Sequence, residues 1–401
     1  MDIKSTRALK QALFFCVLPA ILLDGVFVEE LGNIKSYQPT HPVFQLALTL
    51  ILVAISPLKI TKFDFWFCII FFGVLIVYTL IGGLWSFRWE WQNFDLILVV
   101  ASGFFLSIVI LSDEEENALN NLLLGYLVLS VLILGFRASI HFSQVHWRGG
   151  MNIFGGASLL HVCLLYGAFL PSQKAYLGFM NPITFFVTLL FLSVIFDNRV
   201  IFLVCLCLVL FECFLLTLKY KAYKFVMLLV LLSAGLAYQT IPFLEITITR
   251  WARFTEILGS QSLRLCDIVG PERCEMWQFG FDAFSYNWLG YGIGSFHDVF
   301  NQGYHSPHSL AVSMMFIAGA PGIISFVLWV FISLNLILRG MVSSGQKVSN
   351  NVSKLLMFIG LLLSVNTTGE DLIQVSGYLS PIFLVVLITS FLRLRSHILQ
   401  I

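Results

Sequence analysis

The sequence predicts an all-α polytopic membrane protein, and three observations carry this prediction. The chain is 58% hydrophobic and only 11% charged, whereas soluble domains carry about 25% charged residues. The apolar residues come in long blocks of about 20, the length that crosses a bilayer as a helix. One polar and glycine-rich stretch, 271–322, interrupts these blocks. The net charge of +1 gives no reason to expect a nucleic-acid partner.

About twelve apolar runs meet the length rule for a transmembrane helix. We expect these spans near 12–28, 41–58, 64–85, 94–112, 118–136, 153–171, 176–196, 200–218, 225–244, 309–338, 355–368 and 378–392. The first run follows Lys4, Arg7 and Lys10 but lacks a small-residue cleavage site, so we interpret it as an uncleaved span.

The chain divides into three parts and has no evident repeat. Spans one to nine occupy 1–244, a loop of about 64 residues occupies 245–308, and spans ten to twelve occupy 309–401. The tenth span carries Gly319-Ala320-Pro321-Gly322, a sequence that can break it. The long loop is rich in aromatic residues and glycine, so we expect it to be ordered.

The distribution of Lys and Arg predicts that both termini are cytoplasmic. In this topology the lysines lie mostly in the inner segments and the arginines mostly in the outer ones. A guanidinium group matches a phosphate or carboxylate in bidentate fashion, which lysine cannot do. The outer face is therefore expected to bind an anion, although generic contacts with lipid headgroups would produce the same bias.

The long outer loop is expected to contain at least two helices. Its opening segment, 250–258, has apolar and basic residues on different faces, as in a helix that lies on the membrane surface. A second helix is expected to start at Pro271, a residue suited to the first helical position. Trp277, Phe281 and Phe284 follow it at helical spacing and predict an apolar stripe.

Arg273 falls in the first turn of this second helix, where the helix dipole disfavours a cation. A bound anion would relieve that conflict. The structural alternative is an ion pair with Glu272 or Glu275 on the protein surface.

Gly290, Gly292 and Gly294 form a run with alternate glycines. No strand and helix surround it in the way that a dinucleotide fold requires. We interpret it as a tight turn that returns the chain to the membrane.

His308 directly precedes the tenth span and is the candidate general base, because imidazole accepts protons near neutral pH. The alternative is a polar residue that merely marks the end of a span, with His305 as a second such marker. No Cys or Asp at ligand spacing completes a zinc site, so no metal is predicted.

Other outer-side residues are candidates for supporting roles. Arg199 lies in a short outer turn, where it could meet an anion or pair with Asp197. Glu370 and Asp371 occupy another outer turn and could orient the histidine or a sugar, or simply cap a span. Cys266 and Cys274 both lie in the long loop and can form a disulfide if the outer compartment is oxidising. These two cysteines would close a short segment beside Arg273.

Together these residues resemble the superfamily of bacterial O-antigen ligases and O-antigen polymerases. The resemblance covers the twelve-span topology with one large periplasmic loop between spans nine and ten. Its motifs are an Arg at the outer end of a span, Arg-x-x-x-Trp followed by a glycine-spaced segment, and a His before a span with two later glycines. These positions are filled by Arg199, by Arg273, Trp277, Gly290, Gly292, Gly294 and Phe296, and by His308, Gly319 and Gly322.

Three positions depart from the family pattern. Ser309 stands where Asn is common after the His, Ile317 stands where a Glu is common, and Asn198 stands where Ser usually precedes the Arg. These departures leave the acceptor and the subfamily open, while the His and both Arg are retained.

The resemblance implies a GT-C-like fold in the bacterial inner membrane with its active site in the periplasm. It implies an inverting, metal-independent glycosyl transfer, with no cofactor, from a glycan on undecaprenyl diphosphate to the lipid A-core or to a lipid-linked glycan. Arg199 and Arg273, and with a poorer motif match Arg264, would hold the diphosphate, and His308 would activate the acceptor. Ligase and polymerase both fit, with a preference for the ligase. The alternative from another functional class is a transporter of polyprenyl-linked glycans.

Overall fold

The structure is a computed structural model, and it describes five continuous stretches together with scattered positions elsewhere. The continuous stretches are 3–17, 40–86, 91–113, 271–293 and 309–342, and the scattered positions lie within 118–132, 187–210, 295–299 and 385–396. These described residues form helices and contain no strand, which confirms the predicted all-α class for this part of the chain. The number of spans and the extent of the outer loop stay predictions.

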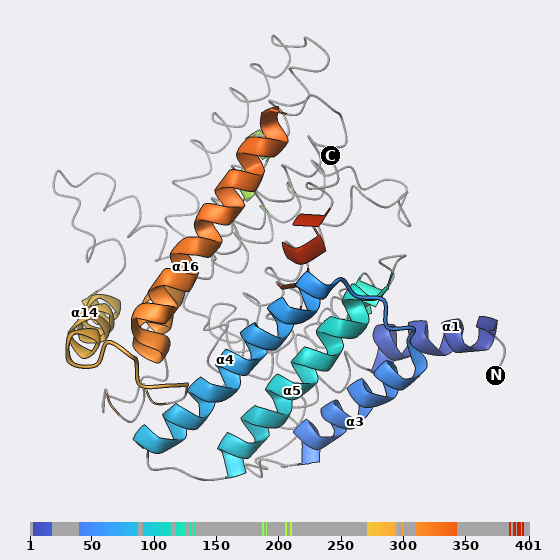
Figure 1. The fold of residues 1–401 in the computed structure, drawn as a ribbon, viewed down its shortest axis with the longest axis horizontal. Helices are drawn as coiled ribbons and strands as arrows, with labels where there is room; N and C mark the ends of the chain where they lie inside the picture. The colour runs from blue at the N-terminus through green and yellow to red at the C-terminus, as the bar shows by residue number, and fades with distance from the viewer. Residues whose placement is uncertain are drawn as a thin grey trace, which may run out of the picture.

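Three helices near the N-terminus form one layer: α3 (Thr40–Ile55), α4 (Lys62–Ser86) and α5 (Trp91–Leu111). Helix α4 runs antiparallel to the other two, which are parallel to each other (Figure 1). The central helix is α5, which contacts both of the others (Figure 1). Their bounds match the spans expected near 41–58, 64–85 and 94–112 to within about three residues, the usual uncertainty of helix ends. Apolar block length alone was therefore sufficient to locate them.

The first apolar run starts differently from the single span expected near 12–28. An α-helix, α1 (Ile3–Ala12), comes first and continues into a short π-helix, η1 (Leu13–Val17). Helix α1 carries Lys4, Arg7 and Lys10 among apolar and small polar residues, and Phe14, just beyond its end, is fully buried. The remainder of the expected span lies outside the described residues.

Helix α4 begins with a side-chain cap. The amide of Asp64 donates to Thr61 Oγ1 at 3.1 Å, and that hydroxyl donates to Asp64 Oδ2 at 2.7 Å. This reciprocal pair satisfies an amide that the first helical turn leaves without a partner. It explains why the helix starts at Lys62 and not deeper in the apolar run.

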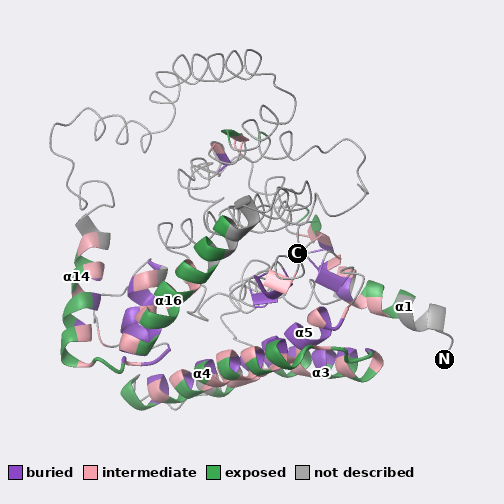
Figure 2. Ribbon diagram, turned by 45° about the horizontal axis from the view of Figure 1, so that its top comes forward, coloured by how far each residue is buried: buried purple, intermediate pink, exposed green. Residues whose placement is uncertain are grey.

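Helix α4 is apolar on all sides. One face is buried against α5, where the absent side chain of Gly103 lets the Phe72 ring approach, and Phe72 packs edge-on against Phe104 at 6.1 Å. The opposite face leaves large apolar side chains exposed, visible as the green stripe in Figure 2. They follow helical spacing: Trp66, Ile70, Val74, Val77, Leu80 and Leu84. A helix of this kind suits a solvent that is itself apolar.

Three hydroxyl groups in or next to α4 and α5 bond to a carbonyl group of the same helix. The side chains of Thr79, Ser102 and Ser112 each donate to the carbonyl oxygen four residues earlier, at 2.7 to 2.8 Å. Such back-bonding satisfies a polar group without help from water. Two helical segments, Lys62–Trp85 and Ala311–Ile332, are long and apolar enough to cross a membrane, judged by length and composition.

The longest helix, α16 (Leu310–Val342), has a break in its first half. Gly319 there has φ 57° and ψ −139°, values outside the helical region, and Pro321 follows it. This confirms the predicted interruption at Gly319-Ala320-Pro321-Gly322. Ser309 precedes the helix and accepts a 3.4 Å hydrogen bond from the amide of Val312 through its hydroxyl, as an N-cap residue does.

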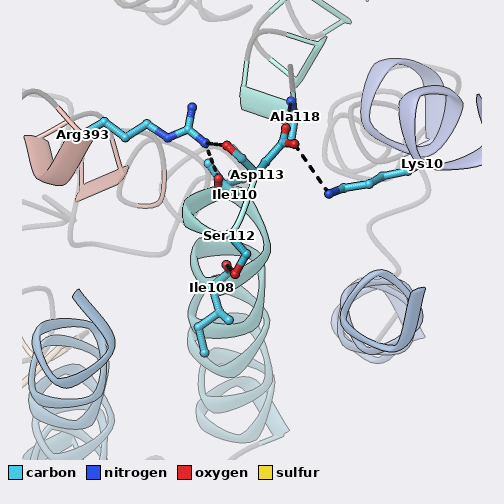
Figure 3. Close-up of polar contacts among 7 residues, drawn as sticks. All are labelled: Lys10, Ile108, Ile110, Ser112, Asp113, Ala118 and Arg393. Atoms are coloured by element: carbon cyan, nitrogen blue, oxygen red, sulfur yellow. Dashed lines mark hydrogen bonds and ion pairs between the residues drawn. The ribbon is translucent and has the colours of Figure 1, made fainter. Parts of the chain in front are cut away.

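Far from this break, the C-terminal end of α5 is held by a charged cluster (Figure 3). One guanidinium nitrogen of buried Arg393 donates to the carbonyl oxygen of Ile110 and, at 2.9 Å, to that of Asp113. The Asp113 carboxylate accepts from the amide of Ala118 at 2.6 Å and lies 3.9 Å from Lys10 Nζ. Three separate parts of the chain thus meet at one helix end, where a cation complements the helix dipole.

Replacing Arg393 should destabilise the protein far more than replacing Lys10. Arg393→Met leaves buried carbonyl groups without a hydrogen-bond donor, which costs about 1–3 kcal/mol for each group. Lys10→Met removes only a longer ion pair that solvent reaches, worth about 1 kcal/mol or less. Thermal unfolding of both purified variants in the same detergent checks this ranking, and equal midpoints would contradict the capping role of Arg393.

Candidate functional site

The polar stretch at 271–293 forms one helix and a short extended segment beside α16. The helix, α14 (Pro271–Tyr286), begins at the predicted proline. It packs on the first half of α16, where a side chain at Gly280 would collide with Val312 and the rings of Phe279 and Phe316 lie 6.1 Å apart. The glycine therefore sets how closely the two helices approach.

The packing face of α14 differs from the stripe that the sequence predicted. Met276, Gly280 and Ala283 are buried, while Phe281 is 57% exposed. The stripe that contains Phe281 lies on the neighbouring face of the helix, with Trp277 and Phe284 half-buried. Small residues decided the contact, because they let two backbones come close together, whereas large aromatic side chains would hold them apart.

Immediately after α14 the chain turns at Asn287. The side-chain amide of Asn287 donates to the carbonyl oxygen of Gly290 at 2.8 Å, and its side-chain oxygen accepts from the amide of Leu289 at 3.3 Å. An Asn that bonds its own backbone in this way stabilises a turn. The turn sends the segment 288–293 across the break in α16.

Segment 288–293 replaces the helical hydrogen bonds that α16 loses at its break. The amide of Ala320 donates to the carbonyl oxygen of Trp288 at 2.8 Å, and the amide of Tyr291 donates to that of Phe316 at 2.9 Å. Pro321 has no N–H group, so the Ile317 carbonyl oxygen has no helical donor, and the amide of Gly292 supplies one at 2.9 Å. We call this set of contacts the glycine junction.

Helix α4 forms the other side of the glycine junction. The amide of Ile293 donates to the Tyr78 carbonyl oxygen at 2.9 Å, and the Tyr78 hydroxyl donates to the Ala318 carbonyl oxygen at 3.2 Å. The Tyr291 ring stacks on Phe316 with centroids 4.9 Å apart and lies 5.1 Å from that of Trp85. The extended segment is therefore bonded on both sides, by α4 and by α16.

Glycine is required at three positions of the junction, Gly290, Gly292 and Gly319, for two reasons each, and the last two illustrate both. Gly292 has φ 87° and Gly319 has φ 57°, values that side chains disfavour. A Cβ atom at Gly292 would collide with the backbone of Gly82, and one at Gly319 would collide with the backbone of Trp288. Backbone meets backbone at both places, so neither contact can relax by moving a flexible side chain.

The sequence indicated both glycine motifs but not that they meet. The run at Gly290 and Gly292 was predicted to be a tight turn that returns the chain to the membrane, and in the structure it runs along the break predicted at Gly319. Alternate glycines are a known sign of close backbone approach. The third partner, Tyr78 with Gly82, was missed, because nothing in an apolar span distinguishes a glycine that contacts another segment.

Only part of the predicted site lies within the described residues. Arg273 is in the first turn of α14, with Cys274 next to it and half-buried Trp277 one turn later. The other candidates fall outside the described residues: Arg199, Arg264, Cys266, His305, His308, Glu370 and Asp371. Of the motif that begins at His308, the structure describes Ser309, which is buried, and the two glycines of α16.

Cys274 is disulfide-bonded. Cys68 and Cys205 are buried and form no disulfide, so neither is its partner. Disulfides persist in oxidising compartments, so this bond agrees with an outer location for α14. The predicted pairing with Cys266 stays a prediction.

Among the described residues, no group of three or more His, Cys, Asp or Glu side chains could hold a metal ion. Searches with known protein-family models and with the sequences of curated proteins found no match to this chain.

Gly292→Ala should destabilise the protein through the junction. The added methyl group would collide with the backbone of Gly82, and alanine disfavours the positive φ of this position. Strain of this kind costs about 1–3 kcal/mol. Gly73→Ala is the matched control, because a methyl group at Gly73 of α4 meets nothing within 4 Å. Thermal unfolding should show a lower midpoint for Gly292→Ala only, and an unchanged midpoint would mean that the junction is not formed.

Peptide mapping without reduction should recover Cys274 linked to Cys266. Cys68 and Cys205 should be labelled by a thiol reagent only after unfolding, since both are buried and form no disulfide. A Cys274 peptide linked to another cysteine, or found as a free thiol in protein from the native membrane, would contradict the pairing.

Proposed function

We propose that this chain is a multi-pass glycosyltransferase of the bacterial inner membrane. It moves a glycan from undecaprenyl diphosphate to an acceptor hydroxyl at the periplasmic face. The acceptor proposed is the lipid A-core, which makes the protein an O-antigen ligase. Both termini are placed in the cytoplasm in this proposal.

Membrane placement is supported by the apolar surface of the described helices. Trp66 is 59% exposed and Ile70 is 63% exposed, on the face of α4 opposite α5. Contiguous exposed apolar surface of this kind marks contact with a partner protein or a membrane. Hydroxyl groups such as that of Thr79 bond within their own helix, and two described helices are long and apolar enough to cross a membrane. Both observations favour contact with a membrane.

The observation that carries the proposal is the glycine junction. Two motifs of the family resemblance, one beginning at Arg273 and one at His308, are separate in sequence, but the segments that carry their glycines bond to one another through backbone groups. The junction therefore holds the helix that bears Arg273 beside the helix that follows His308. Such a contact is expected if both motifs serve one site.

The electrostatics of α14 suit a diphosphate. Arg273 adds a guanidinium group to a helix N-terminus, whose free amides and dipole already favour an anion. The disulfide at Cys274 restrains the same turn. A cation in this turn would stabilise negative charge as it develops on a leaving group.

The proposed reaction is a direct displacement with inversion at the anomeric carbon. The acceptor oxygen forms a bond to that carbon while the bond from carbon to the diphosphate oxygen breaks. His308 takes the proton of the acceptor hydroxyl. Undecaprenyl diphosphate leaves with the bonding electrons, and Arg273, Arg199 and Arg264 neutralise its charge.

Arg273→Ala should lower glycan transfer by roughly a hundredfold or more, the usual loss when one charge-stabilising donor is removed. The assay uses purified protein in liposomes with an undecaprenyl-diphosphate-linked glycan and lipid A-core. Gln278→Ala is the matched control, because Gln278 is exposed on the opposite side of α14 and should keep full activity. Full activity of a folded Arg273→Ala variant would reject the diphosphate clamp.

The lipopolysaccharide ladder of a strain that lacks the protein separates the alternatives. A ligase defect removes O-antigen from the lipid A-core while lipid-linked polymer accumulates. A polymerase defect leaves a single repeat unit on the core. An unchanged ladder would point to another glycan or to the transporter reading.

A further inference from the structure

The glycine junction lies well inside the length of both membrane-crossing helices. On α4 its partner Tyr78 is about seven residues, or about 10 Å, before the end of the apolar segment at Trp85. On α16 its partner Ala320 is about nine residues, or about 14 Å, after the start of the apolar segment at Ala311. On both helices the junction therefore lies inside the apolar segment and not at its end.

This depth corresponds to the acyl chains of one leaflet. The hydrocarbon core of a bilayer is about 30 Å thick, so each leaflet contributes about 15 Å. The ends of α4 and α16 that meet here are those beside α14 (Figure 1), the side assigned to the periplasm. If both helices cross the membrane, the segment 288–293 reaches below the surface of the outer leaflet.

The backbone of the segment suits that position. The amides of Gly290, Tyr291, Gly292 and Ile293 all donate to carbonyl oxygens of the protein. Non-helical backbone is tolerated at membrane depth only where protein or trapped water satisfies it. Gly290, Gly292 and Ile293 are also buried, so these residues do not present unbonded backbone to lipid.

The side chains of segment 288–293 also suit a position among the acyl chains. Trp288 is 63% exposed and Leu289 is 50% exposed, and both are apolar over most of their surface. The exposed face of α4 ends beside the junction with Leu84, 59% exposed, and Trp85, 48% exposed. An exposed apolar pair thus lies next to an exposed apolar helix face, and acyl chains can cover both.

We propose that residues 287–293 form a re-entrant loop, in which Trp288 and Leu289 contact the acyl chains of the outer leaflet. This inference rests on the membrane placement in the proposed function but not on glycosyl transfer. It makes α14 a helix that is anchored in the bilayer and not a soluble element above it. Arg273, at the far end of the same helix, is then held at a constant height relative to the membrane.

The test is depth-dependent quenching of tryptophan fluorescence in liposomes of brominated phosphatidylcholine. The liposomes contain no polyprenyl donor, so any quenching reports phospholipid. Subtracting the emission of Trp288→Phe from that of the wild type isolates the Trp288 signal, and Trp85→Phe isolates the Trp85 signal in the same way. Trp288 should lose most emission with bromine near the middle of the acyl chain, and Trp85 with bromine near the glycerol.

Each other outcome overturns the inference at a different point. Trp288 emission that resists all bromolipids while Trp85 is quenched would mean that the loop is outside the bilayer or covered by protein. Quenching of Trp288 only by shallow bromine would place the loop at the headgroups. If neither residue is quenched, α4 does not cross the membrane, and the membrane placement in the proposed function fails too.

A second variant guards against misfolding of Trp288→Phe. Leu289→Trp adds an emitter to an otherwise unchanged chain, and its added signal should also be quenched by bromine near the middle of the acyl chain. Ser285→Trp is the control for water, since Ser285 is exposed on the last turn of α14 and should respond to aqueous iodide. A Leu289→Trp signal that responds to iodide and not to bromolipid would reject the re-entrant loop.

Discussion

The arrangement of α4, α14 and α16 depends on the carbonyl groups that are freed where α16 breaks. Gly319 leaves the helical conformation and Pro321 offers no amide, so the oxygens of Phe316 and Ile317 lose their helical donors. An unpaired backbone group in an apolar setting costs several kcal/mol. The amides of Tyr291 and Gly292 remove this cost, and the chain after α14 is therefore bound to the break.

This constraint has a consequence for the candidate site. The motif residues around Arg273 and those that follow His308 belong to segments with no local reason to be adjacent. The backbone bonds of the junction join them, and the disulfide at Cys274 restrains the first turn of α14. Catalytic groups that act together need positions fixed to a fraction of an ångström. Backbone-to-backbone contacts provide such fixation better than side-chain packing, because few rotatable bonds separate the partners.

A different kind of contact holds the opposite end of the helical layer. There Arg393 bonds carbonyl oxygens at the end of α5, and Asp113 links that end to α1. Charged groups can perform this task only where the helices leave the apolar region, because a charge at the bilayer centre is costly. Within the apolar region the same need is met by amides and glycines. The position of each contact along the helices thus determines its chemistry.

The sequence by itself determined the helical class, the positions of four long helices and the break in α16. These features depend on block length, on capping residues and on Gly and Pro, which act within a few residues of themselves. It also marked Arg273, Trp277 and the glycines of the site, because polar and glycine-rich residues are conspicuous in an apolar chain. A pairing for Cys274 was anticipated, since two cysteines share the polar loop.

Only the tertiary structure decided which face of α14 is buried and which segments meet at the junction. Large aromatic residues predicted the stripe at Trp277 and Phe281, yet the buried face of α14 contains Met276, Gly280 and Ala283, and Gly280 sets the close approach to α16. The partnership of Gly82 with Gly292 joins positions far apart in the chain, while Gly73 of the same helix has nothing within 4 Å of where its side chain would start. Which glycine accepts another backbone depends on how the helices are placed in space, and local sequence does not encode that placement.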